Sequence, residues 1–296
     1  MFHVKLVDRD PRKYYIQSRL HADCSLLGYM TEEVTARTQV GARVVAVANQ
    51  KGGVGKTTTA INLATSIALS GRRVLLIDVD PQGNLTSGMG LKGARAEQGT
   101  VYEALMTDAP AEAFVLPTRV ENLFAIPADR NLTGAEIELV AMLAREQRLK
   151  RIVDALRGQF DDIFIDSPPS LGLLTLNALV AADAVLIPLH CEYFALEGLA
   201  DLVGTMRLVR TALNPTLDIE GVLLTMYDDR TNLGQLVARD VREFFKDKVF
   251  NTIIPRNVRL GEAPSHGIPA VLYDVKSRGA AAYVALAKEM LARRAA

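Results

Sequence analysis

Short apolar runs alternate with longer stretches of helical periodicity from residue 43 to the C-terminus. The predicted strands cover residues 44–49, 74–80, 123–128, 163–169, 184–189, 221–226 and 250–255. The predicted helices cover about residues 56–70, 134–157, 172–181, 196–213, 233–246 and 279–294. Strands that alternate with helices indicate a doubly wound α/β fold, and near-continuous apolar strands indicate a mostly parallel sheet that helices bury on both faces.

Two segments depart from this alternation. Residues 1–42 are mixed in charge and show no sustained period, so we interpret them as an N-terminal extension ahead of one domain over 43–296. Residues 83–121 are rich in glycine at first and weakly periodic. They predict a surface excursion with a short helix near residues 101–106.

Composition narrows the class of protein. With 296 residues and 49% apolar content, the chain can bury one large core. Lys plus Arg and Asp plus Glu both total 34, so a nucleic-acid surface would have to be local. Cys24 and Cys191 are far apart and lack the spacing of a metal or redox pair, which favours a reduced, cytoplasmic protein. No run approaches the roughly 18–20 apolar residues of a membrane span.

Polar and glycine-rich residues follow almost every predicted strand. Parallel strands end at the same edge of a sheet, and ligands of such sheets bind beyond that carboxyl edge. The sequence therefore predicts a binding site there. The segments that meet at this edge are NQKGGVGKTT, DVDPQGN, DSPPS, PLHCEYF, TMYDDRTN and IPRNVR.

The first of these segments has the chemistry of a phosphate-binding loop. Its glycines let the backbone turn sharply and aim N–H groups at phosphate oxygens, and the following helix adds its dipole. Lys56 is placed to reach the β and γ phosphates, the Thr57 hydroxyl to bind Mg²⁺, and Thr58 to meet the α phosphate. The predicted loop consists of Gly52, Gly53, Val54, Gly55, Lys56, Thr57 and Thr58.

A second lysine opens this loop. The usual GxxxxGK[ST] pattern requires glycine where Gln50 stands, and Lys51 follows it. Because Lys56 already serves the β and γ phosphates of its own nucleotide, a second lysine would be redundant within one subunit. Lys51 is therefore a candidate to reach the nucleotide of a partner.

Three aspartates end two of the strands. Asp78 and Asp80 are two residues apart, so an extended chain directs both to one side. Asp166 closes the strand before DSPPS, where an acid of this kind of fold holds Mg²⁺ directly or through water. The alternatives are turn chemistry at Asp80-Pro81 and Asp166, and a purely structural role for Asp78.

With these motifs the chain closely resembles the ParA/Soj family of chromosome and plasmid partitioning ATPases, which carry a deviant Walker A loop. The resemblance implies a P-loop ATPase that binds ATP, ADP and Mg²⁺ and closes as an ATP-sandwich homodimer. It makes Lys51 the lysine that contacts phosphates across the dimer and Lys56 the one that acts within the subunit. Asp80 would position the attacking water, and Asp78 would support the magnesium and the phosphate loop. Hydrolysis would be slow until a ParB-like activator accelerates it.

The resemblance also covers the runs IPADRNLTGAEIEL, PLHCEYFALEGL, TMYDDRTNLG and IPRNVRLGEAPSHG. It implies that Thr225, Met226, Pro255 and Asn257 lie near the adenine, although Met226 fits a plain core position as well. It implies that Arg230 and Arg259 bind double-stranded DNA without reading its sequence, which would place the protein on the nucleoid.

Three other functions share parts of this pattern. A MinD-like ATPase binds membrane through a C-terminal amphipathic helix, whereas the last predicted helix here is rich in alanine and lacks Phe and Trp. An iron–sulfur carrier needs paired cysteines. A metabolic ligase or kinase needs a pocket for a small acceptor. We therefore expect an ATP-dependent partitioning protein without stable membrane association.

Overall fold

The computed structural model describes residues 41–295, apart from 193, 194 and 229. The predicted extension over residues 1–42 lies outside the described residues except for Gly41 and Ala42. The described chain forms an eight-stranded sheet in the order β3-β4-β2-β5-β1-β6-β7-β8. The strands are β1 (Arg43–Val47), β2 (Val74–Asp78), β3 (Leu116–Pro117), β4 (Leu123–Ile126), β5 (Asp162–Asp166), β6 (Ala184–His190), β7 (Asp218–Tyr227) and β8 (Ile254–Pro255).

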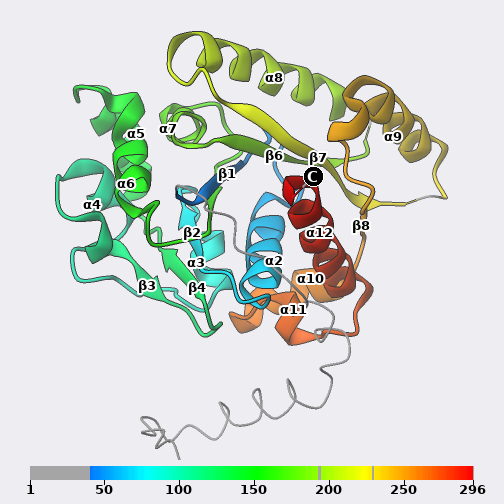
Figure 1. Cartoon of the computed structure of the whole chain (residues 1–296), viewed down its shortest axis with the longest axis horizontal. Coiled ribbons are helices and arrows are strands. Elements are labelled where there is room, and N and C mark those ends of the chain that lie inside the picture. Colours follow the sequence, from blue (N-terminus) through cyan, green and yellow to red (C-terminus); the bar gives the residue numbers. More distant parts are fainter. Residues whose placement is uncertain (1–40, 193–194, 229, 296) are drawn as a thin grey trace, which may run out of the picture. The chain divides into compact units, whose positions relative to one another are not determined.

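Helices cover both faces of this sheet (Figure 1). α2 and α12 pack together on one face, and α7, α8 and α9 cover the other. The helices are α2 (Lys56–Ala68), α3 (Asn84–Gly88), α4 (Val101–Met106), α5 (Leu132–Leu139), α6 (Arg148–Leu156), α7 (Leu173–Ala181), α8 (Ala195–Ala212), α9 (Asn232–Phe245), α10 (Val258–Glu262), α11 (Ala270–Tyr273) and α12 (Arg278–Ala295).

The strand pairing confirms the predicted fold class. Every strand pair is parallel except β3 with β4, which is antiparallel. Successive side chains of a strand point to opposite faces, so a strand covered on both sides is apolar at every position. In β1, Val44, Val45, Ala46 and Val47 are all fully buried.

The helix predicted over residues 134–157 is wrong as a single element. The chain forms α5, a short 3-10 turn at Arg145–Gln147, and then α6. Ala144 takes a left-handed φ of 51° before the turn. Asn177 of α7 fixes the break, because its side chain donates to the Arg145 carbonyl at 2.8 Å and accepts from the Leu149 amide at 3.1 Å. A tertiary contact therefore outweighs a continuous helical pattern.

The surface excursion predicted over residues 83–121 is also wrong. This segment contains α3, the short helix α4 at its predicted place, and β3. Leu85, Leu105 and Phe114 are at most 1% exposed, so the segment contributes to the core. Most of its glycines lie in turns between short elements. Short elements show a weaker hydrophobic periodicity than long ones, so the sequence pattern did not reveal α3 and β3.

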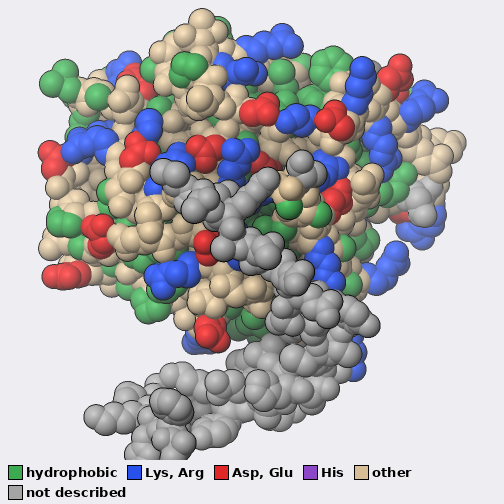
Figure 2. Space-filling model, in the orientation of Figure 1, with side chains coloured by type: hydrophobic (Ala, Val, Ile, Leu, Met, Phe, Trp, Pro, Cys, Tyr) green, Lys and Arg blue, Asp and Glu red, His purple; other side chains and the backbone are tan. Residues whose placement is uncertain are grey.

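Charges of both signs lie on the face of the molecule that Figure 2 shows. Figure 2 shows basic and acidic side chains interspersed over the visible face, in agreement with the equal totals of 34. Within the described ranges, no helix is long and apolar enough to cross a bilayer.

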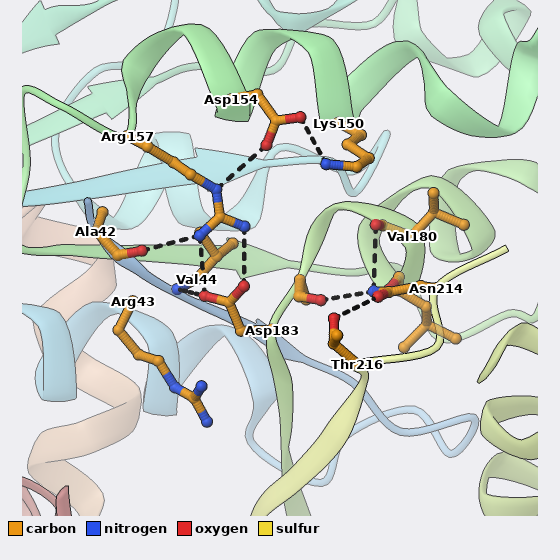
Figure 3. A network of polar contacts seen from close by, with 12 residues as sticks. Ala42, Arg43, Val44, Lys150, Asp154, Arg157, Val180, Asp183, Asn214 and Thr216 are labelled. Atoms are coloured by element: carbon orange, nitrogen blue, oxygen red, sulfur yellow. Dashed lines mark hydrogen bonds and ion pairs between the residues drawn. The ribbon is translucent and has the colours of Figure 1, made fainter. Parts of the chain in front are cut away.

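The amino edge of the sheet is tied together by polar contacts (Figure 3). Arg157, just after α6, donates to the Ala42 carbonyl at 3.0 Å and to Asp183 at 2.9 Å. Asp183 in turn accepts from the Val44 amide at 2.8 Å. Asn214 donates to the Ala182 carbonyl at 2.7 Å, just past the C-terminal end of α7. These contacts stabilise the amino ends of the strands. The carboxyl edge of the sheet, where ligands are expected, lies on the opposite side.

Candidate functional site

A cavity of about 1020 Å³ opens at the carboxyl edge of the sheet. It is large enough for a nucleotide, since small-molecule sites span about 300–1000 Å³. It brings together segments that follow β1, β2, β5 and β8 with the last residues of β7. The predicted site residues that line it are Gly52, Gly53, Gly55, Lys56, Thr57, Thr58, Asp80, Thr225, Met226 and Asn257.

The loop between β1 and α2 has the backbone of an anion cradle. Gly53 and Gly55 have φ values of 72° and 88°, a left-handed region that a side chain would strain. Gly55 caps α2, so the first amides of that helix point toward the cavity. Val54 is buried instead, and its carbonyl accepts from the Thr225 hydroxyl at 2.8 Å. The end of β7 thereby holds the loop in place.

Lys56 is buried within this loop. Its side chain is 7% exposed, and Nζ donates to the Lys51 carbonyl at 3.1 Å. Burial lowers the pKa of Lys56, while Asp166 and Asp80 act in the opposite direction. A weakly solvated ammonium of this kind gains most from phosphate oxygens placed beside it.

Lys51 points to a different place. Its Nζ forms an ion pair with Glu192, whose other oxygen lies 2.9 Å from Nδ1 of His190. Lys51 does not line the cavity, and its side chain is 32% exposed. The two lysines of one loop are therefore separated. Lys56 lies inside the cavity, and Lys51 lies outside it at the surface of the protein.

Thr57 and Asp166 form a candidate magnesium site. The Thr57 hydroxyl donates to Oδ2 of Asp166 at 2.7 Å. Oδ1 of Asp166 is buried and has no hydrogen-bond partner in the described structure. Burial, and then the neighbouring Asp78, raises the pKa of Asp166 well above its usual range. A hydroxyl beside a buried carboxylate oxygen without a partner fits a hard divalent cation.

The two-residue spacing of Asp78 and Asp80 predicts that both face the phosphates, but Asp78 does not line the cavity. Asp80 lines the cavity, and its Oδ1 accepts from the Gln82 amide at 3.0 Å. Asp78 is fully buried, and burial raises its pKa to about 6. Its carboxylate accepts from the backbone of Asp80 and from Thr86, so its contacts are with the segment after β2.

The predicted base-side residues are only partly brought together. Met226 lines the cavity with a left-handed φ of 48°, at an irregularity in the pairing of β7 with β8. Asn257 caps α10, since its Oδ1 accepts from the Arg259 amide at 2.9 Å. Pro255 belongs to β8 and does not line the cavity, whereas its neighbour Arg256 does.

The two predicted DNA-binding arginines lie on the surface beside acids. Arg230 is bonded to Asp228 at 2.6 Å, and this hydrogen bond lowers the pKa of Asp228 to about 2. Arg259 pairs with Glu262 at 2.7 Å and approaches Asp274 at 3.3 Å. A phosphate would therefore compete with carboxylates of the same chain for both guanidinium groups.

Three residues of the site were not predicted from the sequence. Asn49 joins the loop to β6, because its amide donates to the Pro188 carbonyl at 2.7 Å and its oxygen accepts from the Lys51 amide. A polar residue directly after a buried strand was a signal that could have identified Asn49. Thr86 carried no such signal, because its partners lie across a turn or just beyond another strand. Glu192 lies in the PLHCEYF segment predicted at this edge, but its partner Lys51 is remote in the sequence.

Known proteins resemble this chain in sequence over most of its length. A family model described as an AAA domain matches residues 42–219. The sporulation initiation inhibitor protein Soj of Bacillus subtilis is 58% identical over 250 residues, which are 84% of this chain and 98% of that protein. The chromosome partitioning protein ParA of Myxococcus xanthus is 55% identical over 251 residues, which are 85% of this chain and 88% of that protein.

Solved structures share the fold. Cobyrinic acid a,c-diamide synthase from Mycobacterium smegmatis, with bound ADP and magnesium, has a TM-score of 0.74 and 39% identity over 86% of this chain and 96% of that one. The cell division ATPase MinD of Pyrococcus furiosus has a TM-score of 0.69 and 28% identity over 85% and 99%. Because more than half of the aligned residues are identical over 98% of Soj and 88% of ParA, the chain belongs to the ParA/Soj family of chromosome-partitioning ATPases.

Proposed function

We propose that ATP and Mg²⁺ switch this ATPase from a single chain to a face-to-face dimer, and that the dimer binds double-stranded DNA without reading its sequence. The observation that carries the proposal is the separation of the two loop lysines. Lys56 is buried in the nucleotide cavity, and Lys51 lies outside it against Glu192.

This separation matches two different tasks. Lys56 is surrounded by the loop and by carboxylates, so it serves the nucleotide of its own subunit. Lys51 is partly exposed, and surface ion pairs such as its contact with Glu192 are weak. Its side chain can therefore exchange Glu192 for the phosphates of a nucleotide bound to a second copy.

Hydrolysis would be carried out by residues already in the cavity. Thr57 and Asp166 would hold the magnesium ion, which neutralises charge on the phosphates when it is bound. Asp80 lines the cavity and would position the attacking water. The released phosphate and ADP would no longer hold two subunits together, so hydrolysis would end the bound state. A ParB-like activator would supply the acceleration.

DNA binding would depend on the dimer. Arg230 and Arg259 each pair with acids of their own chain, and the total charge of the protein is zero. A single copy therefore has little net attraction for phosphates. Two copies double the number of contacts, and affinity for DNA rises steeply with the number of phosphates neutralised. The ATP-bound dimer would thus reside on the nucleoid in the cytoplasm.

The membrane alternative loses its structural basis at α12. Of the apolar residues of that helix, Tyr283, Leu286 and Met290 are at most 1% exposed because α12 packs against α2, whereas Leu291 is half-buried. A helix that binds a bilayer needs this face for lipid. Co-sedimentation with anionic vesicles in the presence of ATP tests this alternative directly.

The deciding experiment measures binding to a random-sequence DNA duplex with ATP, ADP or no nucleotide, at two salt concentrations. We expect ATP alone to give salt-sensitive binding. Lys51→Ala and Lys56→Ala should abolish it, and Asp80→Ala should prolong it because the bound state is not hydrolysed. Binding that is equal with ATP and ADP would contradict the switch. Normal binding by Lys51→Ala would contradict the role of that lysine across the dimer.

A further inference from the structure

The segment that carries Asp80 into the cavity has little regular structure of its own. It runs from the end of β2 to α3, and α3 is 5 residues long. Gly83 precedes α3 with a left-handed φ of 60° and offers no side chain to cap it. Other contacts must therefore hold Asp80 in position.

Asp78 supplies the first of these contacts. Its Oδ1 accepts from the Asp80 amide at 3.2 Å. Its Oδ2 accepts twice from Thr86, from the amide at 2.8 Å and from the hydroxyl at 2.7 Å. One buried carboxylate thereby joins the two ends of the segment, the residue that faces the cavity and the middle of α3.

Thr86 supplies the second contact. Its hydroxyl oxygen accepts from the Ala128 amide at 2.8 Å, just beyond the end of β4. The hydroxyl therefore donates to Asp78 and accepts from Ala128, which uses its single proton and one lone pair. Thr86 is 3% exposed and does not line the cavity, although its neighbour Ser87 does.

We propose that Thr86 is a positioning residue for hydrolysis, which holds Asp80 at the cavity by fixing Asp78 and α3 to the end of β4. The proposal rests on the proposed role of Asp80 in positioning water. Thr86 does not line the cavity, so its hydroxyl affects the rate of the chemical step and leaves nucleotide binding unchanged. A displacement of about 1 Å in a positioned group costs up to about a hundredfold in rate.

The test compares Thr86→Val with Thr86→Ser in the full chain. Valine keeps the shape of threonine and removes the hydroxyl, whereas serine keeps the hydroxyl. We expect Thr86→Val to lower kcat for ATP hydrolysis about tenfold to a hundredfold. The Kd for a non-hydrolysable ATP analogue with Mg²⁺ should stay within about threefold, and Thr86→Ser should recover at least about half of the rate.

Thr118→Val is the matched control. The Thr118 hydroxyl also accepts a backbone amide, that of Val120 at 3.0 Å, but it lies in the turn between β3 and β4, at the opposite end of β4 from Ala128. Its kcat should equal that of the wild type. Should Thr86→Val fail to fold, Thr86→Ala provides the same comparison with a smaller side chain.

Asp80→Ala separates the failure of this inference from that of the proposed function. If Thr86→Val lowers kcat in the wild type but adds no further loss to the residual rate of Asp80→Ala, the hydroxyl acts through Asp80 as proposed. If Asp80→Ala is inactive but Thr86→Val hydrolyses ATP normally, the Thr86 inference alone is wrong. If Asp80→Ala itself hydrolyses ATP normally, both are wrong. A parallel loss of kcat and analogue affinity in Thr86→Val would also overturn the inference, because it shows a general effect on the site.

Discussion

Strand β5 begins and ends with a fully buried aspartate, and the two ends have opposite surroundings. At the amino end, Asp162 is bonded to Arg72 at 2.7 Å and to Arg294 at 2.6 Å. At the carboxyl end, Asp166 accepts only from the Thr57 hydroxyl, and one of its oxygens has no partner among the described residues. The same residue type in the same strand is therefore ion-paired with two arginines in one place and bonded to one hydroxyl among the described residues in the other.

The amino end is a closed network. Arg294 of α12 also binds Glu220 at 2.6 Å, and Glu220 binds Arg43 at 2.8 Å. Burial raises the pKa of Glu220, but Arg294 and Arg43 outweigh it, so the pKa is lowered overall. Each acid has a cation, and the network fastens the C-terminal helix to β1, β5 and β7.

The carboxyl end is an open cluster. Asp80 and Asp166 share Lys56 as a nearby cation, and burial raises the pKa of both Asp78 and Asp166. A buried charge without a partner is costly, and such sites persist where a ligand completes them. Pairing, more than burial, therefore distinguishes the acids at the two ends of β5.

The largest expected change in stability comes from the closed network at the amino end of β5. Asp162→Asn leaves Arg72 and Arg294 without their shared counter-charge, so the free energy of unfolding should fall by about 3–5 kcal/mol. Urea unfolding measures this. Asp154→Asn is the control, because Asp154 also has two cationic neighbours but is exposed, and it should cost less than about 1 kcal/mol. Equal losses of unfolding free energy in Asp162→Asn and Asp154→Asn would show that burial of the ion pairs makes no difference to stability.

A substitution in the open cluster should lower the rate of ATP hydrolysis and should not lower the free energy of unfolding. Asp166→Asn should reduce ATP hydrolysis by at least about a hundredfold, because the candidate magnesium site loses its charge. Its free energy of unfolding without nucleotide should not fall, since an unfavourable buried charge is removed. Steady-state hydrolysis and urea unfolding of the same preparation test both statements. A large loss of stability would show that Asp166 is structural.

The two ends should also have opposite pH dependence in the nucleotide-free protein. The folded-state pKa of Asp78, about 6, exceeds the ordinary value of 3.8, so its contribution to stability is full below pH 3.8 and is lost as the pH rises through 6. Glu220 has a lowered pKa, so its contribution is present above 4.5 and is lost as the pH falls through the folded value.

The free energy of unfolding, measured at two pH values, isolates the contribution of Asp78 in the open cluster. Between pH 5 and pH 7.5 the wild type should lose about 1 kcal/mol relative to Asp78→Asn, which cannot ionise. A constant difference between the two proteins over this interval would show that Asp78 is already charged at pH 5.

The smallest expected effect concerns the exposed ion pair of Lys51. Glu192→Gln removes the contact that holds Lys51 in the single chain, so ATP-dependent dimerisation should strengthen by at most about fivefold. Sedimentation velocity with a non-hydrolysable ATP analogue measures the change, and Glu112→Gln on a distant surface is the control. Weaker dimerisation of Glu192→Gln would show that Glu192 supports the dimer.

Most strands of the fold could be predicted because their apolar runs are local. The single helix over residues 134–157 could not be divided, because Asn177 of another helix causes the break. The phosphate loop could be predicted as a unit because its residues are consecutive. Thr86 was missed because its partners, Asp78 and Ala128, become neighbours only when β2 and β4 pair in the sheet.

The sequence by itself determined the phosphate loop, the parallel sheet and the edge at which ligands bind, because each follows from residues close together in the chain. The tertiary structure alone decided which buried acids are paired. Asp162 and Asp166 stand in equivalent positions in the sequence, at the two ends of one apolar run. Arg294, which neutralises Asp162, is 132 residues away, and only the packing of α12 brings its charge to that end of the strand.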